Sequence, residues 1–158
     1  NMWFFWIFGN NIEDRLGHIP FLIFYLVGGL LASACHWLMA TGPAAFVPVI
    51  GASGAVAVTL GAYAVTYPFA RVRTFIFIVV FFTIVELPAL AVLGAWFLMQ
   101  MVSAAEVSNV QMGGGVAWWA HIGGFAAGAI LMPLLTAGSR QPIRQIAGVD
   151  EYPSDFDR

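Results

Sequence analysis

The sequence contains no lysine and few charged residues of any kind. Charged side chains make up 9% of its 158 residues, whereas hydrophobic side chains make up 61%. A soluble domain of this size needs a largely polar exterior, so the composition excludes a water-soluble globular protein and indicates a chain that lies in a lipid bilayer. The arginines are scattered, and the lack of a basic patch argues against a nucleic-acid partner.

Cysteine and clustered metal ligands are scarce as well. Cys35 is the single cysteine, which excludes a disulfide within this sequence and a cysteine-based metal site, and we expect an inert packing role for it. His18, His36 and His121 fall at different predicted depths, and no H-E-x-x-H pair supplies adjacent ligands. We therefore expect neither a metal nor a cofactor.

Long apolar runs are what the sequence does contain. Four of them cover residues 19–40, about 51–70, 74–102 and 116–136. Each run is long enough to cross about 30 Å of hydrocarbon as a helix that rises about 1.5 Å per residue. The opening run, residues 1–8, is too short to cross. We expect it to be the end of a helix that begins before residue 1.

These runs predict an all-α polytopic membrane protein. Residues 1–137 are expected to form a helical bundle with about four full transmembrane helices plus the end of a preceding one. Residues 138–158 are polar and contain two prolines, so we predict a loosely ordered tail on the cytoplasmic side.

The arginines predict how the chain crosses the membrane. An alternating threading of four helices places most of them on one side, which the positive-inside rule makes cytoplasmic. These are Arg15, Arg71, Arg73, Arg140 and Arg144. The loops at 41–50 and 103–115 then face outward, and they contain no arginine.

Two polar residues with catalytic chemistry fall at the same predicted depth, near the outer surface. Ser53 lies 18 residues before Arg71, and His121 lies 19 residues before Arg140. At about 1.5 Å per residue, each is about 27–29 Å from arginines that mark the same surface. A hydroxyl and an imidazole that meet within about 3 Å can act as nucleophile and general base.

Small residues on both helices would let the two side chains approach. Ser53, Ala57 and Gly61 recur on one helix face, and His121, Gly124 and Gly128 recur on the other. Such stripes allow close packing of membrane helices, and Gly51 and Gly54 flank the serine in the same way. The alternative remains that these glycines only pack helices and that the histidine is satisfied by a neighbouring carbonyl.

Three ordered motifs resemble the rhomboid family of intramembrane serine proteases. They are NMWFFWIFGNNIEDRLG at 1–17, GASG at 51–54 and AHIGGFAAG at 120–128. The resemblance covers about residues 1–137 and implies a rhomboid-like bundle that cleaves transmembrane segments of other membrane proteins. It implies that Ser53 is the nucleophile and His121 the general base. It also implies that the backbone N–H of Ser53 and the side chain of Asn1 stabilise the oxyanion, since Asn1 matches the asparagine of the family's H-x-x-x-N motif.

For other polar residues we expect mainly structural roles. Glu86, followed by Pro88 near the middle of the 74–102 run, is expected to be a neutral, hydrogen-bonded carboxyl or, alternatively, to assist helix motion. His36 is expected to pack at the interface beside Trp37. Glu13 and Arg15, which lie two residues apart and so on different helix faces, are expected to fix a turn between helices.

The function that these features predict is an intramembrane serine endopeptidase. Its partners would be transmembrane protein substrates and the lipid bilayer, and its site would open to the outer face because hydrolysis needs water. The leading alternative is a catalytically silent rhomboid-like protein that binds transmembrane helices. A transporter is less favoured, because it would require several intramembrane charges around a midplane site.

Overall fold

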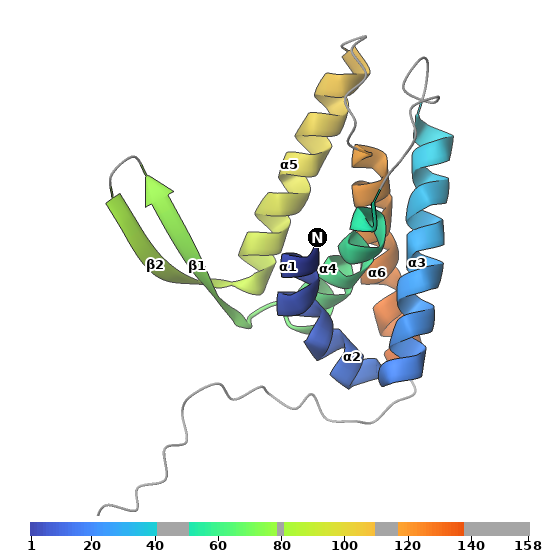
Figure 1. The fold of residues 1–158 in the computed structure, drawn as a ribbon, viewed down its shortest axis with the longest axis horizontal. Helices are drawn as coiled ribbons and strands as arrows, with labels where there is room; N and C mark the ends of the chain where they lie inside the picture. The colour runs from blue at the N-terminus through green and yellow to red at the C-terminus, as the bar shows by residue number, and fades with distance from the viewer. Residues whose placement is uncertain (41–50, 79–80, 110–116, 138–158) are drawn as a thin grey trace, which may run out of the picture.

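The computed structural model describes residues 1–40, 51–78, 81–109 and 117–137. This part of the chain is mostly helical (Figure 1). In chain order it comprises α1 (Met2–Phe4), η1 (Phe5–Gly9), α2 (Asn10–Leu16), α3 (His18–Met39), α4 (Ser53–Thr66), β1 (Arg71–Ile78), β2 (Phe81–Pro88), α5 (Ala89–Asn109) and α6 (Trp118–Thr136). The predicted loop at 41–50 and the tail at 138–158 lie outside the described residues.

Helix α4 is the centre of the bundle. Every residue from Gly54 to Ala64 is buried, because α3, α5, α6 and η1 all contact this helix (Figure 1). At the far end of α4, the side-chain amide of Asn11 donates to the Tyr63 hydroxyl at 3.3 Å. The Tyr67 hydroxyl donates to the Asn11 carbonyl at 3.4 Å. The N-terminal helical segment is thereby fixed against α4.

Glycines let α4 and α6 pack with their backbones in contact. A Cβ added at Gly128 would meet the Val58 carbonyl oxygen, and one added at Gly61 would meet the Phe125 carbonyl oxygen. A Cβ at Gly124 would likewise meet the carbonyl oxygen of Gly54. The stripes of small residues on the two helices therefore face one another, which brings the segments that carry Ser53 and His121 together.

The run at 74–102 does not form one helix, so the prediction of a single span there is wrong. Strands β1 and β2 pair antiparallel, with Arg71 opposite Pro88 and Ile78 opposite Phe81. Aromatic and β-branched residues fill both strands and favour extended structure. Pro88 has no N–H to donate, and α5 begins directly after it. The fold is thus mostly helical rather than all-α.

Helix α5 follows the hairpin and takes up the second half of this run. It continues to Asn109, so residues 103–109, expected in an outward loop, are helical. Its first backbone N–H groups are satisfied at the base of the hairpin, where Ala89 N–H donates to the Ala70 carbonyl at 2.7 Å and Leu90 N–H to the Pro68 carbonyl at 3.0 Å. The hairpin therefore ties the end of α4 to the start of α5.

Glu86 is an exposed carboxylate of the hairpin, which corrects the expectation of a neutral carboxyl inside the membrane. It accepts hydrogen bonds from Arg71 at 3.3 Å and from Arg73 at 3.4 Å. These two hydrogen bonds hold the pKa of Glu86 below its ordinary value of 4.5. An open sheet edge finds no hydrogen-bond partner in hydrocarbon. The hairpin and its charges thus belong outside the apolar layer.

The helices differ in how far they could cross a bilayer. Among the described residues, His18–Met39 and Trp118–Thr136 are long and apolar enough to span one, whereas α4 and residues Ala89–Ala104 of α5 are shorter apolar helices. The 14 residues of α4 extend about 21 Å, against about 30 Å of hydrocarbon. In Figure 1, α4 and α6 begin lower than the upper ends of α3 and α5. Ser53 and His121 therefore sit below the end of the bundle.

Candidate active site

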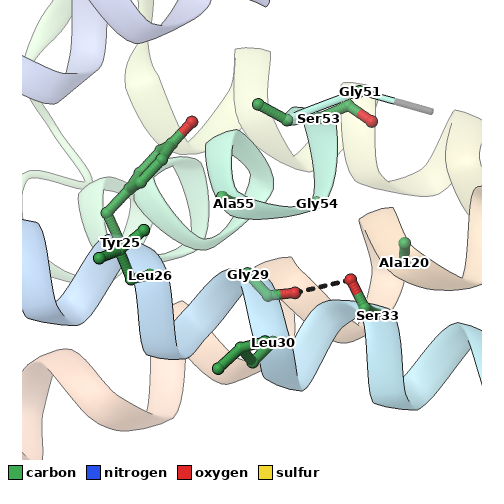
Figure 2. A pocket seen from close by; sticks show the side chains of 11 residues that line it. Tyr25, Leu26, Gly29, Leu30, Ser33, Gly51, Ser53, Gly54, Ala55 and Ala120 are labelled. Carbon is green, nitrogen blue, oxygen red and sulfur yellow. Dashed lines mark hydrogen bonds between the residues drawn. The ribbon is translucent and has the colours of Figure 1, made fainter. Parts of the chain in front are cut away.

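Ser53 is the first residue of α4 and lines a cavity of about 230 Å³. The cavity is bounded by α3 between Tyr25 and Ser33, by the chain from Gly51 to Ala55, and by Ala120 of α6 (Figure 2). Ser53 is partly buried, and its hydroxyl makes no hydrogen bond with another described residue. Ser33, on the same cavity, donates its hydroxyl to the Gly29 carbonyl at 2.9 Å.

The chain turns sharply just before this serine. Gly51 has a φ of +121°, a backbone conformation that side chains with a Cβ rarely adopt. A Cβ placed on Gly51 would lie 3.9 Å from the side-chain nitrogen of Asn1. The turn therefore brings the amide of Asn1 beside the segment that leads into Ser53.

The start of α4 also presents unpaired backbone donors. The first backbone bond of this helix runs from Val56 N–H to the Ala52 carbonyl at 3.0 Å. The preceding N–H groups, at Ser53, Gly54 and Ala55, have no intrahelical acceptor, as is general for the first turn of a helix. They lie at the positive end of the helix dipole. Donors of this kind can stabilise an oxyanion, and the Asn1 amide lies beside the turn at Gly51 that leads into them.

His121 lies in the first turn of α6 and is held from the side of α5. Its Nδ1 is 2.7 Å from Oε1 of Gln100. The rings of Trp96 and Trp118 flank the imidazole, with centroids 5.9 Å and 6.0 Å away. The position and orientation of the imidazole are thus set by one polar contact and two aromatic neighbours.

Ser53 and His121 come to the same level because their chain neighbours touch. A Cβ on Gly54 would lie 3.5 Å from the Cβ of Ala120, and Gly124 packs on the Gly54 carbonyl. No hydrogen bond joins the Ser53 hydroxyl to His121 in the part of the chain that the structure describes. Catalytic hydrogen bonds are often long before substrate binds, and the pairing of these two residues stays a prediction.

The end of α3 completes the surroundings of His121. A Cβ on Gly123 would collide with Cys35, so the last turns of α3 pack on the first turn of α6. His36 is partly buried there, and its Nδ1 has no hydrogen-bond partner among the described residues. Trp37 is 75% exposed. Within the described ranges, no three histidine, cysteine or acidic side chains form a group that could hold a metal ion.

Gln100 is the residue near the site that the sequence did not single out. It is a buried side chain, 6% exposed, in the second half of α5. Its signal in the sequence was a lone amide within an apolar run, L-M-Q-M-V. That signal does not identify a partner, because the fold decides which histidine the amide meets.

A partly buried serine at the start of one apolar helix and a histidine on the helix that packs against it through glycines define a membrane protein with a candidate site inside a helical bundle. The comparisons with known proteins place it more closely: the chain belongs to the rhomboid family, because the Rhomboid domain matches residues 1–138. The fold is accordingly that of a polytopic membrane protein.

One similar protein is the zebrafish (Danio rerio) Presenilin-associated rhomboid-like protein A, mitochondrial. The two are 32% identical over 71 residues, which make up 45% of this chain and 18% of the zebrafish protein. The chain therefore spans less than a fifth of the length of this relative. No solved structure matches the chain.

Proposed function

We propose that this protein is an intramembrane serine endopeptidase that cleaves transmembrane segments of membrane proteins with a Ser53–His121 dyad. The observation that carries the proposal is the contact of Gly54 with Ala120 and Gly124. This contact holds a serine on a cavity and a histidine at one level of the bundle. Membership in a family that includes serine proteases supports the same reading.

The chemistry follows from the groups present. The Ser53 hydroxyl oxygen attacks the carbonyl carbon of the scissile peptide bond, while Nε2 of His121 accepts the hydroxyl proton. The carbonyl oxygen becomes an oxyanion, which accepts hydrogen bonds from the Ser53 N–H and the Asn1 amide. His121 then returns the proton to the leaving amine. Water, activated by the same imidazole, hydrolyses the acyl-enzyme and frees Ser53.

The depth of the site explains how a substrate and water could both reach it. A helix as short as α4 would hold Ser53 below the membrane surface, beside a cavity of about 230 Å³. A helical substrate shields its carbonyls in backbone hydrogen bonds, so the segment must unwind before attack. Small or helix-weakening residues near the cleaved bond should favour cleavage.

The second candidate is a rhomboid-like protein that binds transmembrane helices without cutting them. The observation that favours it is the lack of a hydrogen bond between Ser53 and His121 in the described part of the chain. In that case the cavity beside Ser53 would serve recognition alone, and Ser53→Ala would leave its effects on partner proteins unchanged.

The decisive experiment compares three serine and histidine variants in proteoliposomes. Ser53→Ala and His121→Ala should each lower cleavage of a model transmembrane substrate by about 1000-fold or more, because members of a catalytic unit act together. The matched control is Ser33→Ala, which removes the other serine hydroxyl of the same cavity. It should leave cleavage near the wild-type level.

Labelling with a serine-directed fluorophosphonate gives a second readout that needs no substrate. Wild type and Ser33→Ala should be labelled at Ser53, and His121→Ala should not be labelled. Wild-type protein that is folded, neither labelled nor able to cut any of a panel of membrane substrates, would favour the binding protein instead.

A further inference from the structure

We infer that Gln100 is a positioning residue that fixes the orientation and the tautomer of His121. This inference rests on the proposed function, since it gives the dyad a third member. The juxtaposition that carries it is the 2.7 Å contact between Gln100 Oε1 and His121 Nδ1, made by a side chain that is 6% exposed.

The contact decides which ring nitrogen carries the proton. A carbonyl oxygen only accepts hydrogen bonds, so Nδ1 must donate and therefore keeps its hydrogen. In a neutral imidazole the other nitrogen, Nε2, is then free of hydrogen and can accept the Ser53 proton. Gln100 thus stabilises the one tautomer in which His121 is competent as a base.

Burial makes the loss of this hydrogen bond more costly than it would be in water, so it favours one orientation of the imidazole more strongly. An unpaired amide or imidazole in an apolar bundle has lost its hydrogen bonds to water, which is unfavourable. The rings of Trp96 and Trp118 lie next to the imidazole, and no hydrogen bond joins either indole to His121 in the part of the chain that the structure describes. Rotation of His121 away from Gln100 would therefore give up a hydrogen bond with little to replace it.

The groups around His121 on the packed helices are few. Gln100 and Trp96 face it from α5, and His36 lies in the last turns of α3, which pack on the first turn of α6 through Cys35 and Gly123. From α4, Gly54 packs on Ala120 and Gly124, the chain neighbours of His121. Among these, His36 is the titratable neighbour in the described part of the chain, so its protonation must be monitored separately from that of His121.

Three substitutions separate positioning from packing. Gln100→Met keeps the length of the side chain and removes the acceptor. Gln100→Glu restores an acceptor and adds negative charge. Leu93→Ala is the matched packing control, since Leu93 is fully buried on the same helix two turns earlier.

The first readout is the ¹⁵N NMR spectrum of His121 in the micelle-embedded protein, with His18→Gln and His36→Gln used to assign the other two rings of this sequence. Wild type and Leu93→Ala should show the Nδ1–H tautomer at neutral pH. Gln100→Met should show a mixture or the Nε2–H form. A wild-type spectrum of the Nε2–H tautomer would mean that the amide NH₂ faces the ring, and it would overturn the inference.

The second readout is the rate of cleavage as a function of pH. Gln100→Met should lower kcat by about 100-fold with KM nearly unchanged, since a misplaced or wrongly protonated base affects the transition state. Gln100→Glu should recover most of this loss and move the acidic limb to higher pH, because its carboxylate stabilises the protonated ring. Leu93→Ala should not move that limb.

The two readouts keep the proposals separate. The expected tautomer in a protein that does not cut would contradict the protease and leave Gln100 as the residue that orients His121. Normal cleavage and an unshifted pH limb in both Gln100 variants would contradict the role of Gln100 and leave the dyad intact.

Discussion

Ser53 and Ser33 line one cavity, yet their hydroxyls stand in different environments. Ser33 lies inside a helix and donates back to the Gly29 carbonyl one turn earlier, a common way for serine to satisfy itself in an apolar helix. Ser53 is the first residue of α4, and its hydroxyl makes no hydrogen bond with another residue that the structure describes. Among the described residues, the same residue type thus has a hydrogen-bond partner within its own helix at one position and none at the other.

The pH dependence of cleavage should report His121. Only the neutral imidazole can accept the Ser53 proton, so the rate should fall as pH decreases through the range in which histidine is protonated, ordinarily about 6.5. The measurement is the rate of cleavage in liposomes between pH 8 and about 5, with folding followed by tryptophan fluorescence.

Protonation of Glu86 should not affect the cleavage rate between pH 8 and about 5. Hydrogen bonds from Arg71 and Arg73 lower its pKa below 4.5, so whatever this exposed carboxylate contributes to stability persists above its ordinary pKa. That contribution is lost only as pH falls through the lowered value. A cleavage rate that stays flat down to pH 5, in protein that remains folded, would contradict His121 as the base.

At the scale of elements, the α4–α6 interface is the feature on which the site depends. Backbone contact at Gly61, Gly124 and Gly128 leaves no room for a methyl group. It also sets how closely the helix of the serine approaches the helix of the histidine. A small outward shift of α6 would move His121 away from Ser53 without a change in either residue.

Substitution of Gly128 tests this dependence away from the site. Gly128→Ala should lower the free energy of unfolding by about 1–3 kcal/mol, because the new Cβ collides with the Val58 carbonyl and forces the helices apart. Cleavage should fall with it. Thermal unfolding in detergent and cleavage in liposomes measure the two effects.

Gly94→Ala is the control for this substitution. Gly94 lies in α5, and a Cβ there would meet nothing within 4 Å. Since alanine is the better helix former, this variant should be as stable as wild type or more stable by up to about 1 kcal/mol. Equal stability of Gly128→Ala and Gly94→Ala would show that the interface has room to spare and that the packing argument is wrong.

The hairpin marks where prediction from the sequence failed at this scale. Mean apolarity over residues 74–102 suggested a single span, and apolarity alone does not distinguish a strand from a helix. The density of phenylalanine, isoleucine, valine and threonine between Arg71 and Pro88 was the available signal. Helices α3 and α6 were predicted almost to the residue, because each is one uninterrupted apolar run.

At the scale of the whole molecule, the sequence predicted which ends of the helices lie together, whereas the membrane orientation and the site residues stay predictions. The start of α3, the base of the hairpin and the end of α6 lie toward one end of the bundle (Figure 1), as the arginine pattern indicates. Equal depth of Ser53 and His121 could be read from their distances to arginines. The contact of Gln100 with His121 could not be predicted from the sequence, because a contact between α5 and α6 depends on the angle at which the two helices pack.

The alternating threading makes a prediction that cysteine labelling can check. Cys35 is the single cysteine, so Cys35→Ala gives a background for one introduced thiol at a time. Suitable exposed positions are Asp14 in α2, Thr83 in β2 and Met39 at the end of α3. In sealed right-side-out vesicles, Met39→Cys should react with a membrane-impermeant maleimide, whereas Asp14→Cys and Thr83→Cys should react only after permeabilisation.

The expected sidedness follows from charge, because arginines favour the cytoplasmic face. Asp14 precedes Arg15 in α2, and Thr83 lies in the same hairpin as Arg71 and Arg73. Each single-cysteine protein is first tested for cleavage, so that only active, correctly assembled molecules are interpreted. Labelling of Asp14→Cys and Thr83→Cys from opposite sides would contradict the arrangement in which the hairpin returns to the end where α3 begins. Reaction of both without permeabilisation, with Met39→Cys protected, would keep that arrangement and reverse its direction, so that the cavity beside Ser53 lay nearer the cytoplasm.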